Sequence, residues 1–130
     1  MAIKVTGSTV IDDNKFFLPN NSAEVSTSVS IVSNAITLDL NAAGVFTVAL
    51  TANINTITLS NVQSSGRASS FVLEFTGDGT ARTVIWPANF LWPNDTAPNL
   101  TATAGKKDVF VFYTTDGGVF WQAFISGQNL

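Results

Sequence analysis

The sequence predicts an all-β fold, namely a single antiparallel β-sandwich or jelly-roll-like domain of about eight strands with an extended N-terminal arm. Three observations support this prediction. Apolar residues alternate with Thr, Ser, Asn and Asp, which is the period of two of a half-buried strand. Polar segments rich in Gly, Asn and Asp separate these runs at intervals of roughly 8–12 residues. Apolar residues at helical spacing are almost absent, and 130 residues suit one domain.

Residues 1–34 are interpreted as the N-terminal arm. Residues 4–13 have the pattern of a small hairpin, and the rest of the arm is mainly Ser, Asn and Val. The arm has too few apolar residues to build its own core. Its apolar run therefore predicts docking on another surface, which is either a neighbouring subunit or the arm's own domain. The predicted anchors are Phe16, Phe17, Leu18 and Pro19.

The predicted domain, residues 35–130, opens with three short strands. Residues 35–40 and 45–50 alternate apolar and polar side chains, so each run presents one apolar face. The segment Asn41–Gly44 is expected to form a hairpin loop between them, because Asn and Gly favour tight turns. Residues 57–59 continue the strand pattern. No solenoid-type repeat is recognised in the sequence.

The second half of the domain is predicted to add further strands at residues 71–75, 82–86 and 100–103. Two long aromatic strands follow, at residues 108–113 and 119–125. The segment Thr114–Gly118 between them contains Asp-Gly-Gly, which supplies the positive φ angles of a tight turn. The chain is therefore expected to end in a β-hairpin.

Two Trp-Pro pairs, Trp86-Pro87 and Trp92-Pro93, lie a few residues apart. Proline has no backbone N–H and biases the preceding residue toward extended geometry, so each pair is expected to end a strand. Together with Trp121 and Tyr113, these tryptophans are either core and subunit-contact residues or a platform that stacks on sugars. In a small β-domain the first alternative is the more frequent.

Composition excludes several classes of function. The chain has no Cys and no His, which excludes disulfides, thiol catalysis, a Ser-His-Asp relay and a His-based zinc site. Six scattered Lys and Arg residues in a chain of net charge −3 argue against nucleic-acid and anionic-membrane partners. The N-terminus has no apolar signal-peptide region, so use without Sec export is expected. Only 12% of residues are charged, which suits either a neutral polar surface or a subunit interface.

The acidic residues are the remaining candidates for chemistry. Asp12 and Asp13 are adjacent, so on a strand their side chains point to opposite faces. No pattern brings the other carboxylates, those of Glu24, Asp39 and Glu74, together as a catalytic pair. Asp78 and Asp116 lie in Gly-rich turns, where Asp either bonds its own backbone or ligates Ca²⁺. The sequence therefore predicts a protein that is not an enzyme and has no cofactor.

The residues from Ile36 to Leu130 resemble a module of virion proteins of tailed bacteriophages, notably cyanophages. The resemblance is carried by the run Thr83–Thr101 with its two Trp-Pro pairs, and by the flanking segments Phe71–Thr80, Asp108–Gly118 and Ser126–Leu130. In addition, Gly7–Asp13 is similar to the start of short stalk repeats in phage tail fibres.

This resemblance implies a non-enzymatic, often trimeric structural module with no catalytic residues. A short arm without a fibrous stalk favours a capsid decoration (cement) protein, assembled in the host cytoplasm and bound to the major capsid protein through the arm. A tail-fibre or tail-tip component and a carbohydrate-binding module are the alternatives. Low charge and an arm without its own core also favour a homotrimer.

Overall fold

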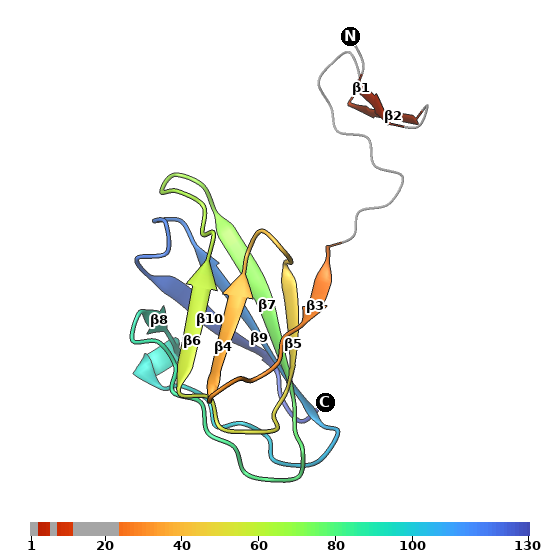
Figure 1. Cartoon of the computed structure of the whole chain (residues 1–130). Helices are drawn as coiled ribbons and strands as arrows, with labels where there is room; N and C mark the ends of the chain where they lie inside the picture. The colour runs from red at the N-terminus through yellow and green to blue at the C-terminus, as the bar shows by residue number, and fades with distance from the viewer. Residues whose placement is uncertain (1–2, 6–7, 12–23) are drawn as a thin grey trace.

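The computed structural model describes residues 3–5, 8–11 and 24–130, which are almost entirely strands and loops (Figure 1). The predicted all-β class is confirmed. The elements are β1 (Ile3–Val5), β2 (Ser8–Ile11), β3 (Ser26–Ser28), β4 (Ala35–Asp39), β5 (Val45–Ala49), β6 (Thr56–Ser60), β7 (Ser69–Thr76), β8 (Phe90–Leu91), the short 3₁₀ turn η1 (Pro93–Asp95), β9 (Lys107–Thr114) and β10 (Trp121–Gly127).

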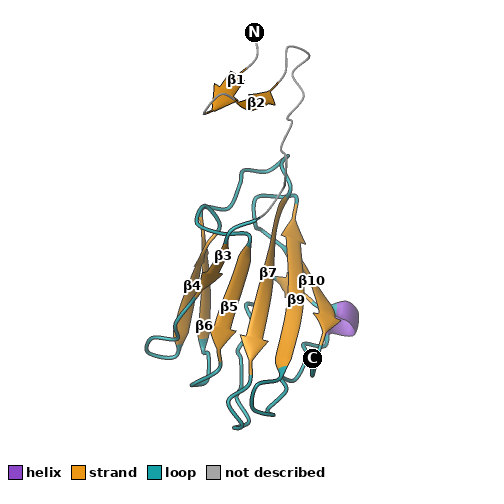
Figure 2. Cartoon of the chain, turned by 90° about the vertical axis from the view of Figure 1, so that its right-hand side faces the viewer, coloured by secondary structure: helices purple, strands orange, loops and turns teal. Residues whose placement is uncertain are grey.

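Two sheets make up residues 24–130. The larger sheet has the strand order β3-β5-β7-β9-β10-β8, and the smaller one pairs β4 with β6. Figures 1 and 2 show the smaller sheet as a second layer against the larger one. Inward-facing residues of both sheets form one apolar core, which includes Leu38, Phe46, Phe71, Phe112 and Trp121. Alternation along each strand thus produces a core between the layers, as expected from the sequence.

The predicted antiparallel pairing is wrong for the first half of the domain. β3 pairs with β5, β5 with β7 and β4 with β6, and all three pairs are parallel. The chain therefore winds from one layer to the other with each successive strand. Asn41–Gly44 is not a hairpin loop but a connection between β4 in the small sheet and β5 in the large one. β4 and β5 each have one apolar face. Because the two strands face each other across the core, both apolar faces are buried.

The parallel winding also reveals a short repeat that the sequence analysis did not recognise. β4 and β6 are aligned without a shift, so that Ile36 lies beside Ile57 and Leu38 beside Leu59. The aligned tripeptides are identical, Ile-Thr-Leu in both strands. Stacking like residues in successive turns of the chain is how solenoid proteins build a continuous core. Here the pattern extends over two turns only.

The three long strands of the C-terminal half are antiparallel, as predicted, whereas the short β8 pairs with β10 in parallel. β7 pairs with β9 and β9 with β10, which confirms the terminal hairpin. Gly117 and Gly118 in its turn have φ values of 76° and 83°, the conformation that favours glycine. Two other expected strands are absent from the described residues. Residues 100–103 form a loop, and residues 82–86 contribute one parallel bridge, between Val84 and Ile54.

The N-terminal boundary of the domain differs from the prediction. β1 and β2 form the expected small antiparallel hairpin. Residues 24–34, however, are part of the domain and not of the arm, because β3 joins the large sheet. Val29 and Ile31 follow β3 and pack against the core. The predicted anchors, Phe16, Phe17, Leu18 and Pro19, lie outside the described residues.

Candidate interaction surfaces

The three tryptophans belong to the core. Trp121 is 1% exposed and Trp92 is 7% exposed, while Trp86 is partly buried against the same cluster. The Trp86 and Trp92 rings meet edge to face, with centroids 4.9 Å apart and planes at 66°. Trp121 meets Phe71 in the same way, at 5.2 Å. Sugar recognition needs exposed, flat-lying rings, so this arrangement fits the core alternative.

The acidic side chains near the turns are engaged by their own surroundings. Asp78 forms an ion pair with Arg82 at 2.6 Å, and that contact, with the Thr80 N–H, lowers the pKa of Asp78. The Asp116 carboxylate accepts hydrogen bonds from the Thr114 hydroxyl and the Phe120 N–H, which lower its pKa. Both residues act as turn-stabilising groups.

Two further carboxylates from the sequence analysis also have structural partners. Asp39 accepts a 2.6 Å hydrogen bond from Asn61 and another from the Asn41 N–H, and these bonds lower its pKa. Glu74 forms an ion pair with Lys107 at 2.7 Å. Across the described residues, no group of three acidic side chains is arranged to hold a metal ion. These carboxylates therefore stabilise the fold locally.

Asp108 is a buried carboxylate whose role the sequence analysis missed. It is 2% exposed and accepts hydrogen bonds from the Thr101 N–H (2.6 Å), the Asn129 N–H (3.0 Å) and the Gln128 side chain (3.3 Å). Burial alone would raise the pKa of Asp108, but these hydrogen bonds outweigh it and hold the pKa below the ordinary value. Asp108 thus fixes the C-terminal residues against the start of β9.

Replacing Asp108 with Asn is expected to lower the free energy of unfolding by about 2–4 kcal/mol, because the new amide leaves a buried N–H without an acceptor. The native Asp108 pKa is depressed, so its stabilisation is present above the unfolded-state pKa and is lost as the pH falls through the folded-state pKa. Urea unfolding of both proteins between pH 7 and pH 3 checks this. The exposed Asp95→Asn is the charge-matched control, and equal acid sensitivity of Asp108→Asn and the native protein would contradict the assignment.

The outward-facing side of the large sheet carries an apolar surface, which we call the outer patch. The strand register places Val45, Val72, Val111 and Phe124 in one row across β5, β7, β9 and β10. Tyr113 stacks on Phe124 with the ring centroids 6.0 Å apart and the planes at 5°. Phe124 is 45% exposed and Tyr113 is 40% exposed. Such contiguous apolar surface typically marks an interaction site.

The charges of the same sheet face cancel. Glu74 on β7 and Lys107 on β9 alternate with the buried Phe75 and Asp108, so both point outward. Their ion pair leaves this part of the surface neutral, whereas the whole chain carries a net charge of −3. A neutral apolar patch suits contact with another copy of the chain, because two acidic molecules repel wherever unpaired charges meet.

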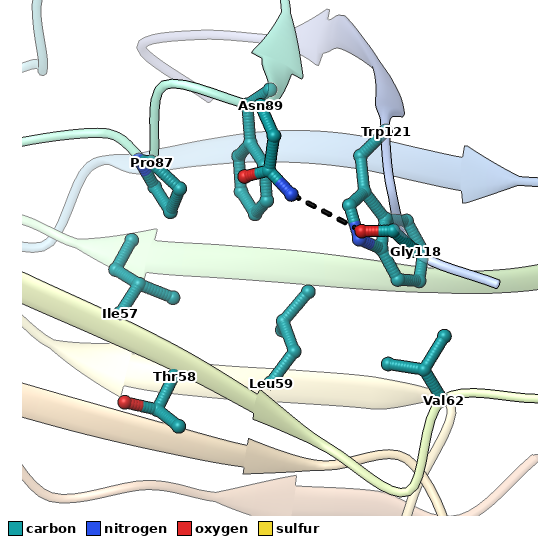
Figure 3. Close-up of a pocket in the computed structure, with 9 residues that line it drawn as sticks. Ile57, Thr58, Leu59, Val62, Pro87, Asn89, Gly118 and Trp121 are labelled. Atoms are coloured by element: carbon teal, nitrogen blue, oxygen red, sulfur yellow. Dashed lines mark hydrogen bonds between the residues drawn. The ribbon is translucent and has the colours of Figure 1, made fainter. Parts of the chain in front are cut away.

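A second feature is a pocket of about 300 Å³ between β6 and the Trp86-Pro87 region. Ile57, Leu59 and Val62 point into it from one side, and Pro87, Asn89 and Trp121 lie opposite (Figure 3). The Asn89 amide already donates to the Gly118 and Val119 carbonyls. Six of the lining residues have apolar side chains, but polar atoms make up about half of the exposed wall, so the pocket has no strong preference for an apolar ligand.

The pocket lies beside an open strand edge. The Thr56 N–H donates to the Asn34 carbonyl and the Ser60 carbonyl accepts from the Leu40 N–H, so the backbone groups of alternate β6 residues face β4. The N–H and C=O groups of Ile57 and Leu59 therefore face away from β4, toward the pocket. Among residues 24–130, no backbone hydrogen bond satisfies these groups.

The Trp86-Pro87 pair explains why this edge is open. Residues 83–85 run parallel to the chain just before β6, with the Ile54 N–H bonded to the Thr83 carbonyl and the Ile85 N–H to the Ile54 carbonyl. This would be the third strand of the small sheet. It stops at Pro87, which has no N–H to continue the ladder. Both Trp-Pro bonds are trans.

Sequence reasoning missed both the outer patch and the β6 edge. A signal for the outer patch was present, since residues 109–113 are apolar without interruption, which is typical of a strand covered on both faces. No known protein family, curated protein or solved structure matches the chain. No helix in the described part of the chain is long and apolar enough to cross a membrane.

Proposed function

We propose that this protein is a non-enzymatic structural component of a bacteriophage virion, and that it acts as a homotrimeric capsid decoration protein. The outer patch carries the proposal, because an uncovered, charge-neutral apolar sheet face is what a self-assembling subunit requires. In this proposal the domain is a two-layer sandwich preceded by an arm, the arm binds the major capsid protein, and the virion is the place of action.

The outer patch suits a threefold arrangement of three copies. In this arrangement the outer patch of each copy faces the common axis, so that each copy contacts the two others. Stable interfaces bury about 800 Å² per partner, and obligate ones more. The exposed Leu91 on β8, which lies beside Gln122 of β10, extends the apolar area beyond the central row. The carbohydrate-binding alternative is not favoured, because the tryptophan rings that it needs lie in the core.

Truncation of the arm tests the proposed attachment. Removing residues 1–23 is expected to leave the melting temperature of the domain almost unchanged but to abolish incorporation into phage particles. Removing residues 1–34 is expected to destabilise the domain as well, because it deletes β3 from the large sheet and removes Val29 and Ile31 from the core. The two deletions thus separate docking from folding.

The measurement is the amount of tagged protein that co-sediments with particles assembled without the native protein, and the calorimetric melting of each variant. Native-level incorporation of the 1–23 deletion would refute the docking role of the arm. An electron-microscopy map of particles carrying the tagged protein distinguishes the head from the tail. Density on the tail alone would replace the decoration proposal with the tail-fibre alternative.

A further inference from the structure

A different pocket, of about 270 Å³, is lined by the Trp86-Pro87 pair, by β8 and by the turn η1, which follow one another along the chain (Figure 1). Trp86, Phe90 and Trp92 form aromatic parts of its wall, and the small side chain of Ala97 leaves space beside them. Sites for small molecules begin at about 300 Å³, so this volume suits a single side chain of a binding partner.

One buried polar group in this wall lacks a partner. Trp92 is 7% exposed, and in the described part of the chain no acceptor lies within hydrogen-bond distance of its indole N–H. A buried tryptophan N–H usually has an acceptor. The rings of Trp86, Phe110 and Phe112 pack on Trp92 with centroids 4.9, 5.7 and 5.7 Å away, and they offer no oxygen. A buried water needs at least two polar partners, so an acceptor carried by a ligand fits this group better.

Asp95 adds a negative charge to the same pocket. Its side chain is exposed, and no ion pair or side-chain hydrogen bond engages its carboxylate among residues 24–130. Asn94 and Asp95 have φ values of 55° and 53°, a conformation that few residues other than glycine adopt. The Asp95 N–H donates to the Trp92 carbonyl at 3.1 Å, which holds this turn in place. The turn therefore keeps an unpaired carboxylate beside an aromatic wall.

We propose that this pocket binds an arginine side chain carried by an extended segment of a partner protein. A guanidinium is planar and weakly hydrated, so it stacks on the aromatic wall while it donates to the Asp95 carboxylate. A backbone carbonyl of the same segment accepts the hydrogen bond from the Trp92 N–H. An ammonium group is more strongly hydrated and has no planar face, so lysine fits this site less well.

The charges of the chain favour a partner protein over a segment of the chain itself. Residues 1–23 contain no arginine, and the two arginines of the sequence are Arg67 and Arg82. Arg82 already forms the 2.6 Å ion pair with Asp78. Each copy of the chain carries a net charge of −3, so an unpaired carboxylate disfavours a second copy and favours a basic partner.

Nuclear magnetic resonance of the isotope-labelled full-length protein tests this site, with N-acetyl-arginine methylamide as the probe. Each tryptophan gives one indole N–H signal, and the signal that is lost in Trp92→Phe belongs to Trp92. This signal is expected to move downfield and to saturate as the probe is added. The uncharged N-acetyl-norleucine methylamide is expected to bind about threefold to tenfold more weakly, because cation–π contacts and exposed ion pairs each contribute modestly.

Two substitutions separate the charge from the cavity. Asp95→Asn should weaken binding of the arginine probe about threefold to tenfold. Glu24→Gln, which removes an exposed charge that does not line the pocket, should leave binding unchanged. Ala97→Leu fills the pocket from its exposed wall and should abolish the response. It identifies the responding indole signal if Trp92→Phe does not fold.

The inference is overturned if no indole signal moves at tens of millimolar probe, or if Ala97→Leu leaves the response intact. Equal binding of the arginine and norleucine probes would also overturn it. Equal binding of N-acetyl-lysine methylamide would overturn the choice of arginine and would point to Lys4 or Lys15 of the arm. Stronger probe binding by Arg67→Ala would show that a second copy supplies the occupant. Because these measurements do not depend on the mass of the assembly, they leave the proposed trimer to its own test.

Discussion

Replacing Trp121 with Ala is expected to lower the free energy of unfolding by about 3–5 kcal/mol, the cost of truncating a large buried aromatic side chain. Trp121 is 1% exposed and packs edge to face on Phe71, and its backbone N–H donates to the Asn89 carbonyl, a bond that the Ala variant keeps. The truncation opens a cavity where β10 meets β8, and its walls are fixed by the surrounding strands. Urea unfolding followed by circular dichroism gives the difference.

Phe120→Ala is the matched control, because the neighbouring Phe120 is 47% exposed and its loss should cost little. If Trp121→Ala kept the native stability and assembly but lost binding to an immobilised glycan, the sugar-platform alternative would replace the core assignment. The same comparison with Trp86 is less decisive, because that ring is only partly buried.

Replacing Phe124 with Lys is expected to dissociate the trimer into folded monomers. Phe124 lies at the β10 end of the central row of the outer patch, where it stacks on Tyr113 and neighbours Val111. A charge buried there without a partner costs about 3–5 kcal/mol, which raises the dissociation constant by roughly 100-fold to 1,000-fold or more. Sedimentation velocity at micromolar concentration measures the change.

Val119→Lys provides the control for this substitution. Val119 is 61% exposed in the turn before β10 and lies outside the outer patch, and the substitution adds the same charge. It should leave the mass unchanged. If Phe124→Lys sedimented like the native trimer, the outer patch would not be the subunit interface, whatever the oligomeric state of the native chain.

Much of the secondary structure was predictable because alternation is a local property of the sequence. The strands at residues 35–40, 45–50 and 71–75 and the C-terminal hairpin follow directly from it. Which strands pair with each other was not predictable, because Asn41–Gly44 suits a hairpin and a connection between layers equally well. The choice depends on Ile57 and Leu59, which lie farther along the chain and align with Ile36 and Leu38. The repeated Ile-Thr-Leu was the available signal.

The candidate surfaces were predictable only in part. That Trp121 and Trp92 are buried follows from their places in apolar runs. The outer patch depends on which strands become neighbours, since Val45, Val72 and Val111 come from three separate segments. The β6 edge depends on a strand that begins at Thr83 and stops at Pro87. A sequence shows where a strand stops, but not which neighbour is thereby left without a partner.

The mass of the purified full-length chain in solution tests the central claim most directly. Multi-angle light scattering at micromolar concentration is expected to give three times the 13.8 kDa of one chain, without a monomer peak. An interface made of the outer patch is apolar and charge-neutral, so high salt should not dissociate it. A stable monomer under the same conditions, with the arm intact, would contradict the account.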